Sequence, residues 1–118
     1  MKSARVAQRK PRSIKEIEPL LVRVRACLRS IYGKRLTDLI LYGSFASGKA
    51  NEDSDIDIAV VLKGDVNKAE EINKIHDAIY SLSLEYRQLI SIYPLSEEEL
   101  GDVEWPLHYY IKNEGIKV

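Results

Sequence analysis

Hydrophobic residues return every three or four positions between residues 13 and 31, which predicts an amphipathic helix. Ser13 and Glu16 fit the capping-box pattern at its start, and Gly33 is expected just beyond its end. The expected buried stripe is Ile17, Leu20, Leu21, Val24, Leu28 and Ile31. A second helical stripe predicts a helix over 67–82, and its members are Ile72, Ile75, Ile79 and Leu82.

Two apolar runs predict neighbouring strands at 36–42 and 55–62, with a small, polar, glycine-containing loop between them. Successive side chains of a strand point to opposite faces, so we expect Asp55 and Asp57 to share one face. The isoleucines that alternate with them point to the other face, toward a core.

The rest of the chain predicts a third strand at 84–93, which Pro94 stops or marks as the edge of a sheet. Ser96 and the three glutamates after it are typical of a helix start. A last helix is expected from Trp105 to Asn113, with its aromatic residues either in the core or in an exposed patch for a partner.

The composition indicates one globular domain. The chain has 118 residues and a formal net charge of zero, so it has no overall field favouring nucleic acid or an acidic membrane. Its one cysteine, Cys27, cannot form an intrachain disulfide, and we expect a cytoplasmic protein. No apolar run approaches the roughly 18 residues that span a bilayer, so no membrane association is expected.

The expected fold is α/β (α+β), a small mixed sheet of three to four strands with helices packed mainly on one face. We expect a single domain over residues 13–118, preceded by a basic tail at 1–12. Two interpretations of the tail stay open: a solvated segment, or a basic arm that contacts RNA, DNA or an acidic partner.

The loop between the first two strands carries the candidate chemistry. Gly43 allows a sharp turn and a close backbone approach to a ligand, and Ser44 adds a hydroxyl. Exposed backbone N–H groups in such a turn bind phosphate. Asp55 and Asp57 on one face repel each other unless a cation lies between them, and Mg²⁺ prefers such oxygen ligands. The sequence therefore predicts a site for a metal-bound nucleotide.

Gly43-Ser44, ten residues, and then Asp55-x-Asp57 resemble the signature of the DNA polymerase β-type nucleotidyltransferase superfamily. The segment 46–48 and the run 54–57 resemble its minimal nucleotidyltransferases, which are often antitoxin partners of HEPN-domain toxins. The resemblance is sharp over residues 39–62.

The resemblance implies transfer of a nucleoside monophosphate, AMP from ATP, to an acceptor hydroxyl. It implies that Asp55 and Asp57 are catalytic and hold two Mg²⁺ ions, and that Gly43 and Ser44 contact the β- and γ-phosphates. Lys49 either adds positive charge to the triphosphate or is a solvated loop lysine.

The superfamily usually supplies a third carboxylate from a following strand. Glu85 is the only acid in the predicted third strand and is the candidate for this catalytic role. Arg87 or Gln88 then occupies the position where relatives carry the acid. If Glu85 does not serve, the protein binds nucleotide with slow turnover or none.

The chain is too short for a separate acceptor-binding domain, so we expect the acceptor on another chain, in a homo- or hetero-oligomer. The resemblance implies a HEPN-type toxin inactivated by adenylylation. The alternative is a non-catalytic antitoxin or nucleotide-binding module that acts by protein–protein contact. Binding of nucleic acid through the basic tail is a third hypothesis.

Overall fold

The computed structural model describes residues 9–102 and 104–118, and it is built on one mixed four-stranded sheet. The strands are β1 (Leu36–Tyr42), β2 (Ile56–Leu62), β3 (Ile90–Ser96) and β4 (Ile116–Lys117), in the spatial order β3-β2-β1-β4. β1 is antiparallel to β2 and β4, whereas β2 and β3 are parallel. The mixed sheet confirms the predicted fold class.

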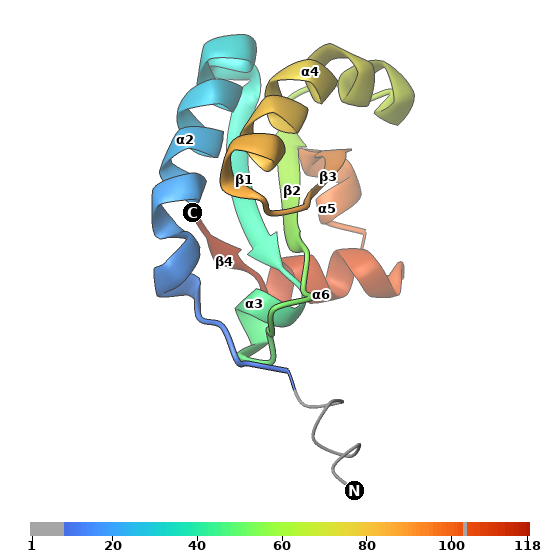
Figure 1. Cartoon of the computed structure of the whole chain (residues 1–118). Coiled ribbons are helices and arrows are strands. Elements are labelled where there is room, and N and C mark those ends of the chain that lie inside the picture. Colours follow the sequence, from blue (N-terminus) through green and yellow to red (C-terminus); the bar gives the residue numbers. More distant parts are fainter. Residues whose placement is uncertain (1–8, 103) are drawn as a thin grey trace, which may run out of the picture.

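Within the described residues, six helical segments accompany the sheet. They are α2 (Ile14–Tyr32), the 3₁₀ turn η1 (Gly33–Arg35), α3 (Ser44–Ser47), α4 (Lys68–Tyr86), α5 (Glu97–Leu100) and α6 (Pro106–Glu114). The two long helices, α2 and α4, cover one face, and α5 and α6 lie behind the other face (Figure 1). Among the described residues, no helix has both the length and the apolar character needed to cross a bilayer.

Each face of the sheet has its own core. Even-numbered residues of β2, from Ile56 to Leu62, join the α2 and α4 side chains in the larger cluster. Ala59 and Val61 face the other way and pack with Ile40, Leu95 and Ile111 in a smaller cluster. Asp57 belongs to the second set by alternation, so its carboxylate lies on the α6 side of the sheet.

Helix α2 begins and ends where the sequence predicts. Ser13 and Glu16 form the reciprocal capping box, and Gly33 follows the last turn with a φ of 54°. The predicted stripe is buried except at its end, where Ile31 is 37% exposed and Tyr32 is buried in its place. The wide apolar face of a globular-protein helix explains this shift by one position.

Helix α4 runs four residues beyond the predicted end. Asn67 caps it as expected, accepting a hydrogen bond from the Glu70 N–H at 3.1 Å. Ile72 is 40% exposed, contrary to its predicted burial, while Glu71 is 4% exposed. The carboxylate of Glu71 can be buried because Tyr32 Oη and Arg35 Nη1 both donate hydrogen bonds to it, each at 2.9 Å.

The predicted strand at 84–93 is wrong in position. Residues 84–86 continue α4, Arg87 ends it in a left-handed conformation with φ 50°, and the strand occupies 90–96. Pro94 lies inside β3, opposite Val60. A strand interior tolerates proline here because, among the described residues, β3 is an edge of the sheet and has no partner strand on its outer side.

The C-terminal segment combines a confirmed helix with a strand that the sequence pattern did not predict. Pro106 occupies the first turn of α6, where its missing N–H costs nothing. Trp105, Tyr109 and Tyr110 are 63%, 48% and 54% exposed, so they form a surface patch, and the buried residues are His108 and Ile111. β4 then pairs with Ile40 and Leu41, near the C-terminal end of β1.

The predicted basic tail falls partly outside the described residues, which begin at residue 9. Within the described part, the segment 9–12 runs along the loop before β2. Arg12 N–H donates to the Ala50 carbonyl at 3.0 Å, and Glu52 N–H donates to the Lys10 carbonyl at 3.1 Å.

Candidate nucleotide site

The turn after β1 has a backbone that only glycine adopts readily. Gly43 has φ 77° and ψ −153°, and the one-turn helix α3 starts at the next residue. The first N–H groups of a helix have no partner within it, so those of α3 remain open to a ligand. Ser44 is the first of these residues and also carries a hydroxyl. This turn lies where the sequence predicts a phosphate-binding loop, and we call Gly43 together with α3 the phosphate turn.

Asp57 lies directly against this turn. A Cβ atom placed on Gly43 would clash with Asp57 Oδ2 and lie 3.2 Å from its Cγ. The register explains the proximity, because Asp57 is the β2 partner of Tyr42, the last residue of β1. The two halves of the sequence signature therefore meet in space.

The two carboxylates of Asp55 and Asp57 repel each other. Asp55 immediately precedes β2, and both aspartates are half-buried. Loss of solvent around Asp57 raises the pKa of its carboxyl, and the charge of Asp55 raises it further. Burial and the neighbouring Asp57 charge also raise the pKa of Tyr42 to about 12. Within the described residues, neither carboxylate forms a side-chain hydrogen bond or an ion pair.

This donor set fits Mg²⁺. Hard divalent cations take carboxylate oxygens, often from one or two acids that share the ion with substrate phosphates. Asp55 and Asp57 offer unpartnered oxygens beside the Gly43 turn, a donor set that suits such an ion. The described residues contain no group of three or more histidine, cysteine or acidic side chains placed to hold a metal by themselves.

Glu85 is not brought to this site. It lies in the last turn of α4, where its carboxylate pairs with Arg23 of α2. Because α2 and α4 cover the sheet face opposite to that of Asp57, Glu85 and Asp57 lie on different sides. The prediction that Glu85 lies on a strand is thus wrong, because helix α4 continues to Tyr86, beyond its predicted end at residue 82.

The residue of β3 that stands beside Asp57 is Ser91. Residues paired in register on neighbouring strands point to the same face, and Ser91 is exposed. Arg87 and Gln88 both precede β3, so neither of them stands beside Asp57. The strand that could supply a third carboxylate therefore presents a hydroxyl.

Lys49 follows the turn on the exposed loop. Its backbone N–H donates to the Ser44 carbonyl at 2.9 Å and closes α3. Lys49 lies two residues after the end of α3, and it is exposed to solvent. The role of Lys49 toward a triphosphate stays a prediction.

A hollow of about 470 Å³ opens beside the phosphate turn. One wall is the end of β1 with α3, and the other is α6. Its lining is Tyr42, Gly43, Ala46, Ser47, Leu107, Tyr110 and Glu114. Pockets of this volume hold small ligands. The sequence did not predict that α6 forms a wall of this hollow. The aromatic residues of α6 were the signal in the sequence that pointed to a functional surface there.

A second group of missed residues lies next along the same face. His108 is buried, and its Nε2 lies 2.9 Å from Tyr93 Oη. Tyr93 occupies the next β3 position after Ser91 on that face. Lys68 Nζ lies 4.9 Å from the Tyr93 ring centre. The site is thus bordered by aromatic side chains and one ammonium group.

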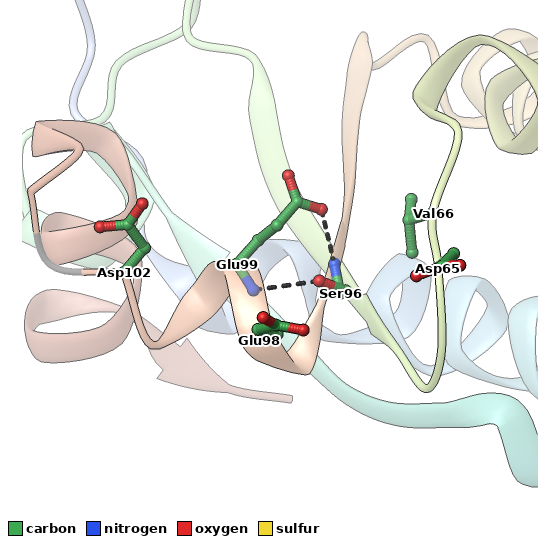
Figure 2. A pocket seen from close by; sticks show the side chains of 6 residues that line it. All are labelled: Asp65, Val66, Ser96, Glu98, Glu99 and Asp102. Atoms are coloured by element: carbon green, nitrogen blue, oxygen red, sulfur yellow. Dashed lines mark hydrogen bonds between the residues drawn. The ribbon is translucent and has the colours of Figure 1, made fainter.

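Another hollow, of about 650 Å³, lies at the opposite end of the strands and has an acidic lining (Figure 2). Ser96 and Glu99 are committed there to the capping box of α5, with N–H to side-chain oxygen distances of 3.0 Å each way. Glu99 also pairs with Lys68 at 3.0 Å. The predicted helix-cap role of these glutamates is confirmed.

Comparisons with known proteins agree with this geometry. Residues 21–118 match the family model of the nucleotidyltransferase domain. A protein of Methanocaldococcus jannaschii, MJ0604, to which protein adenylyltransferase activity is assigned, is 36% identical over 89 residues. That alignment spans 75% of this chain and 83% of the relative.

Two solved structures share the fold. One is a protein of Sulfolobus solfataricus assigned as a nucleotidyltransferase, with a TM-score of 0.60 and 19% identity over 88% of this chain and 83% of that one. The other is a toxin–antitoxin structure with AMP-PNP, with a TM-score of 0.59 and 19% identity over 81% of this chain and 69% of that one.

Proposed function

Because the chain belongs to the nucleotidyltransferase domain family, we propose that it transfers AMP from ATP to a hydroxyl group on a partner protein. The observation that carries the proposal is the contact of Gly43 with Asp57. It joins a phosphate-binding turn to a pair of carboxylates that lack a partner within the described residues.

In this reaction the acceptor hydroxyl loses its proton to solvent water, and its oxygen bonds to the α-phosphorus of ATP. The bond between that phosphorus and the bridging oxygen to the β-phosphorus breaks, and pyrophosphate leaves with the bonding electrons. The Gly43 turn and the Ser44 hydroxyl bind the β- and γ-phosphates, and Lys49 adds positive charge at the open side. Asp55 and Asp57 would hold two Mg²⁺ ions, whose positive charge would stabilise the attacking and leaving oxygens of an in-line displacement.

The nucleoside part of ATP fits the hollow between α3 and α6. This hollow shares Gly43 with the phosphate turn, so a nucleotide can reach both at once. Leu107 and Tyr110 present apolar and aromatic surface there, which suits a nucleobase. The aromatic wall positions the nucleotide and excludes water on one side.

We place the acceptor on a toxin of the HEPN type. The curated relative is assigned as a protein adenylyltransferase, and one structural neighbour is a toxin–antitoxin structure with AMP-PNP. The exposed side chains of Trp105, Tyr109 and Tyr110 belong to α6 and its N-cap, and α6 forms one wall of the hollow. Exposed aromatic clusters are typical of protein interfaces. An acceptor docked on α6 would present its hydroxyl to the nucleotide.

A second candidate function is binding of nucleotide and partner without turnover. Ser91 favours it, because this residue stands beside Asp57 and has no carboxylate with which to accept the hydroxyl proton. Under this alternative the protein neutralises its partner by contact alone.

The test uses ATP labelled separately at the α- and γ-phosphate, with a cell extract as the source of acceptor. Label from the α-position that becomes attached to a protein, with none from the γ-position, supports nucleotidyl transfer. Asp55→Ala/Asp57→Ala should abolish the labelling, and Asp77→Ala, which removes an exposed acid of α4, should retain it. Equal labelling by the double variant would contradict the proposal.

A further inference from the structure

The loop that leads into the aspartate pair has no regular structure of its own. Eight residues, 48–55, separate α3 from β2. Inside the loop, Asn51 Oδ1 accepts a hydrogen bond from Asp53 N–H at 2.8 Å, and Ser54 Oγ accepts one from Asn51 N–H at 2.9 Å. These local bonds shape the loop but do not fix it relative to the rest of the fold. Asp55 needs an external frame to stay in place.

Gln88 and Leu89 supply part of that frame. Gln88 Nε2 donates to the Ser54 carbonyl at 2.9 Å, and the Leu89 carbonyl accepts from Ile56 N–H at 2.9 Å. The backbone is therefore held on both sides of Asp55 by two consecutive residues. Gln88 is only 8% exposed, so these bonds form away from competing water.

Arg12 links this frame to the phosphate turn. Its guanidinium donates to Gln88 Oε1 and lies 5.4 Å from the ring centre of Phe45 in α3. Phe45 is 2% exposed and directly follows Ser44. One side chain thus contacts both the helix of the phosphate turn and the residue that holds Asp55.

The segment before α2 seats Arg12 in this position. Its backbone pairs with the loop on both sides of Asn51, and Arg9 forms an ion pair with Asp53. Arg12 also donates to Glu16 at 3.3 Å, on the first turn of α2. Residues 9–12 therefore pack across the loop, and their C-terminal end is held by α2.

We propose that Arg12 and Gln88 are positioning residues, which fix Asp55 relative to the phosphate turn, so that residues 9–12 are part of the frame of the nucleotide site. The inference rests on the proposed function, because it assumes that the turn and the aspartates bind one Mg²⁺-bound nucleotide. Neither residue touches the nucleotide; both act through the backbone of residues 54–56.

The structure provides a matched control. Arg23 also pairs with a neighbouring side chain, Glu85, and also lies over an aromatic ring, that of Tyr86 at 5.6 Å. It makes these contacts between α2 and α4, on the sheet face opposite to that of Asp57. Arg23→Ala removes the same kind of interaction without touching the loop before β2.

The first measurement is amide hydrogen exchange without nucleotide or metal, on the full chain. Arg12→Ala and Gln88→Leu should each speed exchange of the Ile56 and Ser54 amides at least tenfold. Arg23→Ala should leave these amides unchanged, and Arg12→Lys, which keeps one donor for Gln88, should restore part of the protection. Unchanged exchange at Ser54 and Ile56 in Arg12→Ala overturns the inference.

The second measurement is calorimetric titration with ATP and Mg²⁺. Gln88→Leu and Arg12→Ala should weaken binding about tenfold, while their Tm stays within a few degrees of that of Arg23→Ala. Wild-type affinity in both variants would overturn the inference. If the wild-type protein itself does not bind, the proposed function fails, and the exchange data decide the positioning role. Arg12→Ala, on a half-buried side chain, keeps the test open if Gln88→Leu does not fold.

Discussion

Gly43 and Asp57 lie so close that a side chain on residue 43 would occupy the place of the Asp57 carboxylate. Fourteen positions separate them in the sequence, and the antiparallel pairing of β1 with β2 brings them together. Glycine is therefore required here for two reasons, the backbone conformation and the space.

Gly43→Ala should abolish detectable binding of Mg²⁺-bound ATP and lower the free energy of unfolding. The backbone strain at φ 77° and ψ −153° costs roughly 1–3 kcal/mol for a residue with a side chain. The displaced carboxylate adds to this cost and moves a metal ligand. Calorimetric titration and urea unfolding measure the two effects.

Gly48→Ala is the control for this substitution. Gly48 has the same φ of 77°, but a Cβ there would meet nothing within 4 Å. It should lose about 1–2 kcal/mol of stability from the left-handed conformation alone and keep nucleotide binding. Similar binding by the two variants would show that the contact with Asp57 is unimportant.

Asp57→Asn should raise the Tm at neutral pH in the absence of Mg²⁺. Loss of solvent and the charge of Asp55 raise the folded-state pKa of Asp57, so the wild-type protein binds more protons folded than unfolded. The stability that protonated Asp57 contributes is therefore fully present below the unfolded-state pKa, about 3.9. It is lost as pH rises through the folded-state pKa.

The difference in Tm between Asp57→Asn and the wild-type protein should vanish near pH 3 and grow toward pH 7. Thermal unfolding followed by circular dichroism in EDTA measures it, and Asp77→Asn on exposed α4 serves as control. A Tm for Asp57→Asn below that of the wild type at pH 7 would contradict the proposed repulsion.

Ser91→Asp should make the protein more dependent on metal. A third carboxylate beside Asp57 adds repulsion, so the Tm in EDTA should fall. Mg²⁺ with ATP should then raise the Tm of this variant more than that of the wild-type protein, because the metal also removes the added repulsion. A ligand at 100 times its Kd stabilises either protein by about 2.7 kcal/mol. Ser81→Asp, an exposed change on α4, controls for charge alone. An equal Mg²⁺ response in all three proteins would exclude Ser91 from the site.

Glu71→Gln should destabilise the fold by roughly 1–3 kcal/mol at pH 7, because buried donors of Tyr32 and Arg35 lose a charged acceptor. Burial opposes ionisation of Glu71, but the hydrogen bonds from Arg35 and Tyr32 outweigh it and lower its pKa. The wild-type advantage should therefore be present above pH 4.3, the unfolded-state value, and be lost as pH falls through the folded-state pKa.

Urea unfolding at pH 7 and pH 3 measures this difference. Glu70→Gln, in the same first turn but exposed, should change stability by less than about 0.5 kcal/mol. If both variants behave alike at pH 7, the buried network does not contribute to stability.

Much of the fold could be predicted because its signals are local. The helix at Ser13 has a capping box, and the two strands around Gly43 have apolar runs bounded by turn residues. The β3 region could not be located, because residues 84–86 are compatible with a strand in isolation and become helical through continuity with α4. β4 is two residues long and forms only by pairing with β1.

The candidate site divides in the same way. Gly43, Ser44, Asp55 and Asp57 carry their spacing in the sequence, whereas Glu85 depended on a strand boundary that was wrong. Tyr42, Tyr93 and the α6 residues reach the site only through sheet register and helix packing. The frame formed by Arg12 and Gln88 joins positions 76 residues apart, which no periodicity reveals.

The most direct test of the account is calorimetric titration of ATP with Mg²⁺ into the wild-type protein and Asp55→Ala/Asp57→Ala. We predict binding to the wild type that disappears in EDTA and in the double variant, while both proteins remain folded. Binding of equal affinity to both proteins, or to the wild type without metal, would contradict the assignment of these carboxylates to a metal-dependent nucleotide site.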